Sequence, residues 1–342
     1  MAGDLCTLLG IRYPIIQDGM GPYSTARLAA AVSTAGGLGT VSIPGLNLEP
    51  QEAAHRLRAE LEAAAARTER PFAVNIPVGV DSSGVVLPIT DAYLAAAIEA
   101  RRDDAVLARQ LVACITSAGF SAEASASVRD AGMVHLHKVG AVRHARKAAD
   151  AGVDVVIASG SEMGGHTHER AVHTMVLAPQ VIAALDIPVV VSGGIYDARG
   201  LAAALAMGAA GVAMGTRFAA TVENDWHPAY KQAIVAAGEW SDTLVPGIYG
   251  PMRVLANAGA ADIRARVAAW SGSAADLGSL KEGRVVEAMR NGAVEEGLVL
   301  AGQCAAAIHE IVSVEDLLPG MVHKAASLLA GAAAALQDAA PT

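Results

Sequence analysis

Hydrophobic residues in this chain gather in short runs, and each run stops at a glycine or a polar residue before an alanine-rich segment begins. Short apolar runs that are rich in valine and isoleucine and bounded by turn residues are typical of buried strands. The pattern predicts strands at Tyr13–Gln17, Leu38–Ser42, Phe72–Ile76, Leu111–Ile115, Val134–Val139, Val153–Ala158, Val189–Val191 and Val212–Met214.

Helical periodicity fills most of the segments between these runs. The predicted helices are Thr25–Ala35, Glu49–Arg67, Asp91–Arg109, Ala122–Asp130, Val142–Ala151 and an Ala/Leu helix after Gly194. Regular alternation of strand and helix implies an α/β fold with a parallel sheet, because helices then serve as the crossovers. Eight repeats favour a closed (β/α)8 TIM barrel, and an open doubly wound sheet is the alternative.

Beyond Phe218 the pattern changes to helices without a convincing strand between them. These helices are predicted at His227–Ala237, Ala260–Trp270, Leu280–Asn291 and Val314–Leu336. The last helix would close the barrel. The expected organisation is therefore a barrel from residues 1–218 and 312–336, a helical insertion or lid at 219–311, and a flexible tail at 337–342.

Two further segments are expected to reach the active face of the barrel. The Gly/Ser/Pro stretch Val78–Pro88 has the composition of a mobile loop. Gly302-Gln303 lies near the end of the insertion, from which it would return over the same face.

Glycines end two neighbouring strands of the predicted barrel. Ser192-Gly193-Gly194 follows one strand, and Gly215-Thr216 follows the next. Glycine lets backbone amides approach an anion closely, and the loops after strands seven and eight of such barrels form a recurrent phosphate site. We therefore expect phosphate here; the alternative is that the glycines only make tight turns.

Chain length and net charge limit the number of domains and the kinds of partner that the protein can have. The chain has 342 residues, of which 53% are hydrophobic and 4% aromatic, and its net charge is −9. This is sufficient material for one barrel with an accessory segment. A strongly acidic chain does not favour nucleic acid or an anionic membrane as partner, because both require a basic face. The expected partner is a small-molecule substrate, and a homo-oligomer stays an open alternative.

Cellular location follows from three sequence features. Cys6, Cys114 and Cys304 are odd in number and widely spaced, so neither a disulfide framework nor a thiolate metal site is indicated. The N-terminal stretch lacks the basic and apolar regions of a signal peptide. The longest apolar stretches contain glycine and fall short of the roughly 20 residues that span a bilayer. We expect a cytoplasmic protein.

His166 is the candidate catalytic residue. It follows Gly164-Gly165 near the end of a predicted barrel strand, and histidine exchanges protons near neutral pH. A surface or core role is the alternative for any isolated histidine. His168 and His173 lie close in sequence, but no carboxylate stands at metal-ligand spacing, so no metal is expected.

Lys138, Met20 and Met214 are candidate contacts for a bound ring. Lys138 ends a predicted strand, where it could donate to an electron-rich ring or a phosphate, although strand-end lysines also extend into solvent. His135 and His137 alternate with Lys138, so they should pack under the helices if Lys138 points into the barrel. Met20 and Met214 adjoin strand-end glycines, where a thioether could line a flat ring or simply pack in the core.

The glycine loops by themselves fit either flavin mononucleotide (FMN) or a sugar phosphate. A GxGxxG motif that opens a βαβ unit is absent from the sequence, so a tightly held dinucleotide in a Rossmann domain is not expected.

Several motifs taken together resemble the nitronate monooxygenase family, formerly called 2-nitropropane dioxygenases. The resemblance covers most of residues 5–336. It rests on PIIQDGMG (14–21), AGGLGTVS (35–42), FAVNIPV (72–78), HKVGAVRHARKAADAGVDVVIASGSEMGGHT (137–167) and PVVVSGGIYDARGLAAALAMGAAGVAMGTRF (188–218).

The resemblance implies a TIM barrel that binds FMN noncovalently, with His166 as the catalytic base. It places Gly19, Met20 and Asn75 near the isoalloxazine and Lys138 near its pyrimidine side. The remaining expected cofactor contacts are Gly21, Gly160, Gly165, Ser192, Gly193, Gly194, Met214, Gly215, Thr216 and Gln303.

The sequence departs from common family members at two motifs. Those members read close to QAPMAG where this chain has Gln17-Asp18-Gly19-Met20-Gly21. They read close to QGxEAGGH where this chain has Ala158–His166. The glutamine that usually precedes the equivalent of Gly160 is therefore missing, which weakens the expectation of strict nitronate oxidation.

Three functions compete at this stage. The first is oxidation of alkyl nitronates or nitroalkanes with O2 on FMN. The second is an NAD(P)H-dependent flavin reductase that uses NADH or NADPH as transient reductant and acts on a quinone or an enoyl thioester of acyl-carrier protein or CoA. The cofactor carries the chemistry in both, so one scaffold serves either. The third is a sugar-phosphate isomerase or a noncatalytic phosphate-binding barrel.

Overall fold

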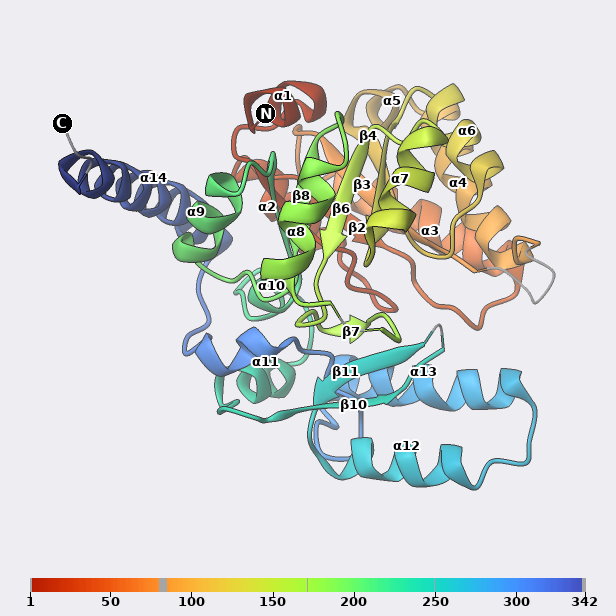
Figure 1. The fold of residues 1–342 in the computed structure, drawn as a ribbon. Helices are drawn as coiled ribbons and strands as arrows, with labels where there is room; N and C mark the ends of the chain where they lie inside the picture. Colours follow the sequence, from red (N-terminus) through yellow and green to blue (C-terminus); the bar gives the residue numbers. More distant parts are fainter. Residues whose placement is uncertain (1, 80–84, 171, 249, 340–342) are drawn as a thin grey trace.

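A closed barrel of parallel strands forms the centre of the molecule in the computed structural model, which describes residues 2–79, 85–170, 172–248 and 250–339 (Figure 1). The sheet runs in the order β1-β9-β8-β6-β5-β4-β3-β2. A parallel bridge between Ile16 and Leu38 joins its two ends. The strands are β1 Ile15–Gln17, β2 Gly39–Ser42, β3 Phe72–Val78, β4 Leu111–Ala118, β5 Val134–Val139, β6 Val155–Ser159, β8 Val189–Ser192 and β9 Gly211–Met214.

All eight predicted strands coincide with barrel strands, so the predicted TIM barrel is confirmed. The helices around it are α2 Ala26–Thr34, α3 Pro50–Ala65, α4 Pro88–Asp103, α5 Ala105–Gln110, α6 Ala122–Asp130, α7 Val142–Asp150, α8 Thr174–Ala183 and α9 Ala198–Ala206.

Two of these helices differ from the expectation. The single helix predicted over Asp91–Arg109 is interrupted at Asp104, whose side chain accepts hydrogen bonds from the amides of Val106 and Leu107 and so caps α5. α8 was not predicted; it contains Pro179 and its apolar residues lack a clear helical stripe. Of the loop Val78–Pro88, residues 80–84 lie outside the described part of the chain.

Alternation along the strands divides the core into an inner and an outer layer. Inward-facing residues such as Ile16, Leu136 and Val190 fill the barrel, and α1 (Ala2–Leu9) closes its N-terminal end with Leu5 and Leu9. Outward-facing residues pack under the surrounding helices. With one end filled, the opposite end, where the strands finish, is left for a site.

The segment after β9 contains helices and also a β-hairpin, which corrects the expectation of helices alone. Its elements are α10 Thr216–Ala219, α11 Pro228–Val235, β10 Asp242–Pro246, β11 Pro251–Leu255, α12 Ala258–Ala268, α13 Ala274–Asn291 and the 3-10 helix η1 Gln303–Ala307. Pro246 and Pro251 pair with each other at the turn end of the hairpin. Prolines and nearby glycines are signals of loops, which explains why the strands were missed.

The hairpin joins the barrel through a third strand. β7 (Gly165–His166) lies antiparallel to β11, with Met252 opposite His166 and Arg253 opposite Gly165. Arg253 also pairs with Asp242 and donates to the carbonyl of Ser161 at 2.9 Å. The insertion is thus tied to the loop after β6, over the C-terminal end of the barrel.

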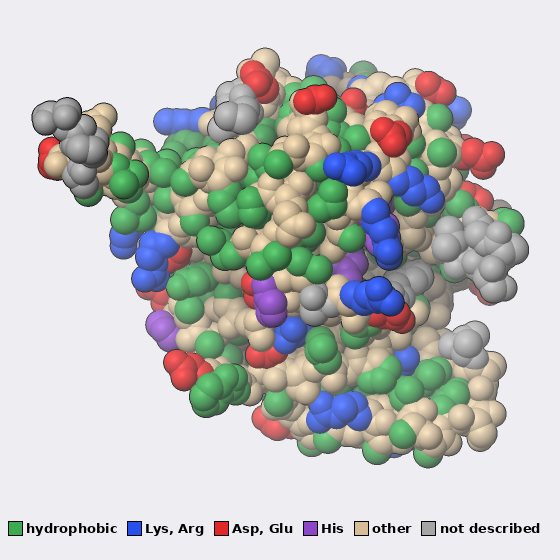
Figure 2. Space-filling view, viewed as in Figure 1, with side chains coloured by type: hydrophobic (Ala, Val, Ile, Leu, Met, Phe, Trp, Pro, Cys, Tyr) green, Lys and Arg blue, Asp and Glu red, His purple; other side chains and the backbone are tan. Residues whose placement is uncertain are grey.

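α14 (Val314–Ala339) is longer than predicted. Its first half packs on α9 with Leu318, Met321 and Ala325 buried, whereas its second half projects from the barrel (Figure 1) and displays hydrophobic side chains (Figure 2). Leu336 in this second half is exposed. Residues 337–339 continue the helix, and 340–342 lie outside the described residues. By length and composition alone Val314–Asp338 could cross a membrane, so the expectation that no stretch reaches that length was wrong.

Candidate active site

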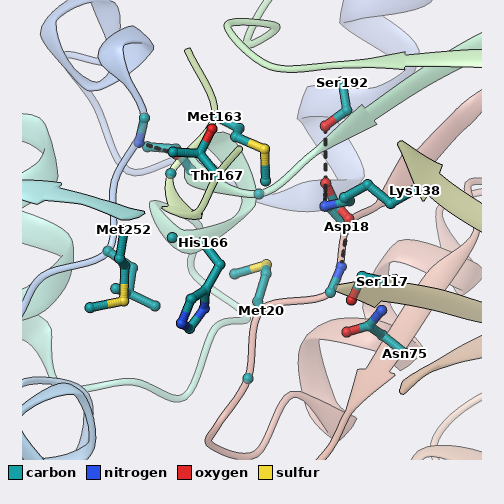
Figure 3. A pocket seen from close by; sticks show the side chains of 18 of the residues that line it. Asp18, Met20, Asn75, Ser117, Lys138, Met163, His166, Thr167, Ser192 and Met252 are labelled. Carbon is teal, nitrogen blue, oxygen red and sulfur yellow. Dashed lines mark hydrogen bonds and ion pairs between the residues drawn. The ribbon is translucent and has the colours of Figure 1, made fainter. Parts of the chain in front are cut away.

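A large cavity opens at the C-terminal ends of the barrel strands. Loops after the barrel strands form most of its wall, and the insertion contributes Ile248, Met252, Lys281, Glu282 and Val285. All the residues predicted to form the site line this cavity, with the exceptions of Gly160 and Gln303. The close view in Figure 3 shows side chains from both parts of the chain meeting there.

Two glycine turns form one wall. Gly193 and Gly194 have φ values of +98° and +74°, a conformation that residues with a side chain rarely adopt. A Cβ on Gly193 would lie 2.8 Å from the carbonyl oxygen of Gly160. Among the described residues, the backbone amides of Gly193, Gly194 and Gly215 find no acceptor. Backbone amides that line a cavity and have no protein acceptor can donate to an anion, so this wall fits a phosphate.

Thr216 adds a side chain to the same wall. Its hydroxyl oxygen accepts a hydrogen bond from the amide of Gly302 at 2.9 Å, and its hydroxyl also forms a side-chain hydrogen bond with Cys304, so an anion in the cavity would compete with that thiol for the hydroxyl proton. The bond with Gly302 also holds the end of the insertion against the barrel. Gln303 itself is exposed and donates its amide to the carbonyl of Glu162 at 3.0 Å; its neighbours Gly302 and Cys304 line the cavity instead.

Gly160 lies behind the wall. A Cβ there would lie 2.0 Å from Oγ1 of Thr174, and its amide donates to the carbonyl of Ser192 at 2.9 Å. The structural requirement for glycine at this position is therefore close packing between the loops after β6 and β8.

Gly19 and Asn75 form the cavity floor. A Cβ on Gly19 would lie 2.1 Å from Oδ1 of Asn75, so only glycine permits this contact. The Asn75 amide nitrogen donates to the carbonyl of Ile115 at 3.1 Å, and the Met20 amide donates to Oγ of Ser42 at 2.8 Å. The first bond fixes the Asn75 side chain on β4, and the second fixes the loop after β1 on β2, so a planar ring would have a firm surface on which to lie.

Lys138 is paired with a carboxylate that the sequence analysis missed. Its Nζ lies 2.6 Å from Oδ2 of Asp18, and the same oxygen accepts a hydrogen bond from Oγ of Ser192 at 3.0 Å (Figure 3). Both charged side chains are nearly buried. The position of Asp18 beside the glycine loop was a usable sequence signal, because a strand-end carboxylate faces the site.

His166 lies in the cavity between Met20 and Met252 (Figure 3). Both glycines before it are required: a Cβ on Gly164 would lie 2.6 Å from the backbone of Ala301 and Gly302, and Gly165 has φ +70°. The Ile248 amide donates to Nε2 of His166 at 3.0 Å. A neutral ring that accepts at Nε2 carries its proton on Nδ1.

Burial, together with the smaller effect of the Lys281 charge, lowers the pKa of His166 to about 4. The ring is therefore neutral at pH 7, and it can accept a proton but cannot supply a positive charge.

Of the neighbouring histidines, His168 also lines the cavity, whereas His135, His137 and His173 do not. His135 and His137 are buried under the helices, as expected, and share the hydroxyl of Thr116 at 2.7 and 2.8 Å. His173 is exposed beside α8 and faces Glu162. Within the described residues, no group of three or more His, Cys, Asp or Glu side chains could hold a metal ion.

The insertion supplies two charged groups that sequence reasoning did not find. Lys281 is 6% exposed, and its Nζ donates to the carbonyl of Gly247 at 3.0 Å. The Glu282 carboxylate accepts the amide of Leu46 at 2.8 Å and the side chain of Asn47. Burial raises the pKa of Glu282. Neither residue belongs to a motif, so no sequence signal separates them from other charges on α13.

Comparisons with known proteins agree with this geometry. A profile of the nitronate monooxygenase family matches residues 3–324. A curated relative from Rhodococcus jostii, named (3aS,4S,5R,7aS)-5-hydroxy-7a-methyl-1-oxo-octahydro-1H-indene-4-carboxyl-CoA dehydrogenase, is 37% identical over 73% of this chain; the match spans only 65% of that relative's length. A probable nitronate monooxygenase from Staphylococcus haemolyticus is 30% identical over 70% of this chain and 74% of its own.

A solved structure shows the same likeness over nearly the whole chain. FabK from Thermotoga maritima is 32% identical, with a TM-score of 0.81 over 96% of this chain and 98% of its own. The chain belongs to the nitronate monooxygenase family, whose members are flavin-dependent oxidoreductases.

Proposed function

We propose that this protein is an FMN-dependent oxidoreductase of the nitronate monooxygenase type, which oxidises alkyl nitronates or nitroalkanes with O2. The observation that carries the proposal is the set of unpaired amides of Gly193, Gly194 and Gly215 beside the Thr216 hydroxyl. A single terminal phosphate matches four convergent donors, and FMN ends in such a group. Bound FMN would supply the electron acceptance and the reaction with O2.

The protein's own groups would then position the cofactor and substrate. Gly19 and Asn75 offer the floor for the ring, and the Lys138–Asp18 pair lies at the side of the cavity between β5 and β1. Met252 and Ile248 from the insertion cover His166 and limit the access of water to it.

The proton of a neutral nitroalkane would go to His166. The C–H bond next to the nitro group breaks, its electron pair stays on the substrate as the nitronate, and the proton moves to the imidazole. The neutral ring is in the correct state at pH 7. Since Nε2 accepts the Ile248 amide, proton transfer to that atom requires Ile248 to move away.

An NAD(P)H-dependent reductase that acts on a quinone or an enoyl thioester is the second candidate. Two observations favour it: a relative at 37% identity is named as a CoA dehydrogenase, and this chain lacks the glutamine before Gly160.

One anaerobic experiment separates the candidates. The purified protein is expected to be yellow and to release FMN on denaturation, and a colourless protein would contradict both flavin functions. The flavin absorbance is then followed after mixing with ethylnitronate and, separately, with NADH and NADPH. Faster bleaching by the nitronate supports the proposal, whereas faster bleaching by a nicotinamide supports the reductase.

A further inference from the structure

Lys281 places a buried positive charge in the cavity without a carboxylate partner. Its side chain is buried, and within the described residues its Nζ donates one hydrogen bond, to the carbonyl of Gly247 at 3.0 Å. Among the described residues, no carboxylate oxygen lies within 4 Å of this nitrogen. Lys138, the other lysine that lines the cavity, has Asp18 at 2.6 Å. The charge of Lys138 is therefore balanced by a carboxylate, whereas that of Lys281 is not.

Each carboxylate that lines the cavity already forms hydrogen bonds or an ion pair with groups other than Lys281. Asp18 accepts from Lys138 and Ser192. Glu162 accepts the amide and hydroxyl of Thr174 at 3.1 and 2.9 Å. Glu282, although next to Lys281 in sequence, is turned toward Leu46 and Asn47. None of these three carboxylates is thus available to compensate Lys281.

An uncompensated buried ammonium is unfavourable for folding, because it loses hydration and gains no opposite charge. An ammonium group has three N–H donors, and the Gly247 carbonyl accepts one of them. The remaining donors and the charge suit an anion that enters the cavity from solvent. Burial lowers the pKa of Lys281 for the same reason, and an arriving anion would restore the charged form.

The position of Lys281 assigns that anion to the substrate rather than to the cofactor phosphate. Its hydrogen-bond partner Gly247 lies in the hairpin turn that covers His166, and its charge is felt by the His166 ring. The phosphate wall at Gly193, Gly194 and Gly215 belongs to other loops.

We propose that Lys281 is the residue that binds the substrate's anionic end, and that the preferred ligand is a small monoanion with two oxygens on one centre, such as a nitronate or a carboxylate. The anion would be held by Nζ with its carbon chain toward His166. This inference rests on the proposed function for the identity of the substrate, but not for the binding of the anion.

The test measures anion binding, with butyrate as a probe that cannot react and butyramide as its neutral counterpart. Isothermal titration calorimetry compares the wild-type holoprotein with Lys281→Met, Lys281→Arg and the control Lys231→Met. Lys231 also donates to backbone carbonyls, those of Thr221 and Asn224, but it does not line the cavity. Lys281→Met is expected to weaken butyrate at least about tenfold, in line with loss of a charge-assisted hydrogen bond.

The other variants should behave differently. Lys281→Arg is expected to retain most of the butyrate affinity, and Lys231→Met is expected to retain all of it. Butyramide should bind with the same affinity to wild type and to Lys281→Met. Equal butyrate affinity in wild type and Lys281→Met would overturn the proposal. An equal loss in Lys231→Met would also overturn it, because the effect would then be a general one on the fold.

Thermal unfolding gives a second readout. Butyrate should raise the unfolding temperature of the wild type and not that of Lys281→Met, because only a ligand of the folded state stabilises it. Lys281→Met without ligand should be at least as stable as wild type, whereas a lysine needed only to hold Gly247 would leave the variant less stable.

If Lys281→Met does not fold, Lys281→Gln takes its place. A colourless protein that still binds butyrate through Lys281 would contradict the proposed function and leave this inference intact.

Discussion

Lys138 at the end of β5 and Asp18 in the loop after β1 form an ion pair of 2.6 Å across the mouth of the barrel. Ser192 at the end of β8 donates to the same carboxylate oxygen at 3.0 Å. Three loops that are far apart in sequence therefore share one charged cluster. A cofactor ring beside Lys138 would meet a compensated pair instead of an isolated positive charge.

Asp18→Asn should raise the reduction potential of the bound flavin. The substitution removes the compensating carboxylate and leaves the Lys138 charge in place, and a positive charge stabilises a reduced cofactor that has gained negative charge. The potential is measured by anaerobic titration against a reference dye. Asp225→Asn is the matched control, because Asp225 forms an exposed ion pair with Arg27 away from the cavity. An unchanged potential in Asp18→Asn would show that this cluster does not act on the flavin.

Gly194→Asp should release FMN, whereas Gly194→Asn should release much less of it. Asp and Asn are similar in shape and both tolerate positive φ better than other residues with a side chain, so they differ mainly in charge. A Cβ at Gly194 would lie 3.5 Å from Cβ of Glu162, so a carboxylate there would add a second negative charge beside the proposed phosphate. The flavin-to-protein absorbance ratio after gel filtration is the measurement. Equal retention in the two variants would remove Gly194 from the phosphate site.

His166→Asn should retain FMN but turn over a neutral nitroalkane about 10²- to 10⁴-fold more slowly, which is the usual contribution of a positioned base. A preformed nitronate has already lost the proton, so its turnover should fall much less. Steady-state oxygen consumption with nitroethane and with ethylnitronate measures both. His173→Asn is the control, since His173 is largely exposed. Equal losses on the two substrates would mean that His166 orients the substrate and does not abstract a proton.

Stability should fall as the pH drops from about 6.5 toward 4, because of the buried histidines. Burial lowers the pKa of His135 to about 4 and that of His137 to about 3. In that window the unfolded chain binds protons that the folded chain does not, so acid favours unfolding by up to about 1.4 kcal/mol per pH unit for each histidine.

Urea unfolding across this pH window measures the effect. His137→Asn keeps a polar atom near Thr116 and should reduce the dependence of the unfolding free energy on pH. His323→Asn, at an exposed position of α14, should leave that dependence unchanged. The same slope in His137→Asn and wild type would show that His137 does not titrate on unfolding.

The barrel was predictable because each strand is a local pattern: apolar runs that end at Gly19, Gly193 or Gly215 carry their own signal. The hairpin was not predictable, since β10 and β11 are short, begin or end at proline, and are stabilised by pairing with β7, a contact made across the fold. The role of Lys281 was also not predictable, because it too depends on contacts across the fold. Its role depends on which carboxylates lie near it, and sequence does not give those distances.

The cavity is shared between two parts of the chain, which the pairing of β7 with β11 joins. The barrel loops hold the features that suit a phosphate and a flat ring, whereas Met252, Ile248 and Lys281 come from the insertion. Because Met252 pairs directly with His166, an exchange of the hairpin would also move the histidine. Replacement of α13 alone by another helix would alter the charge at position 281 and would not change the pairing of Met252 with His166. This is a practical route to new substrate preferences on an unchanged flavin scaffold.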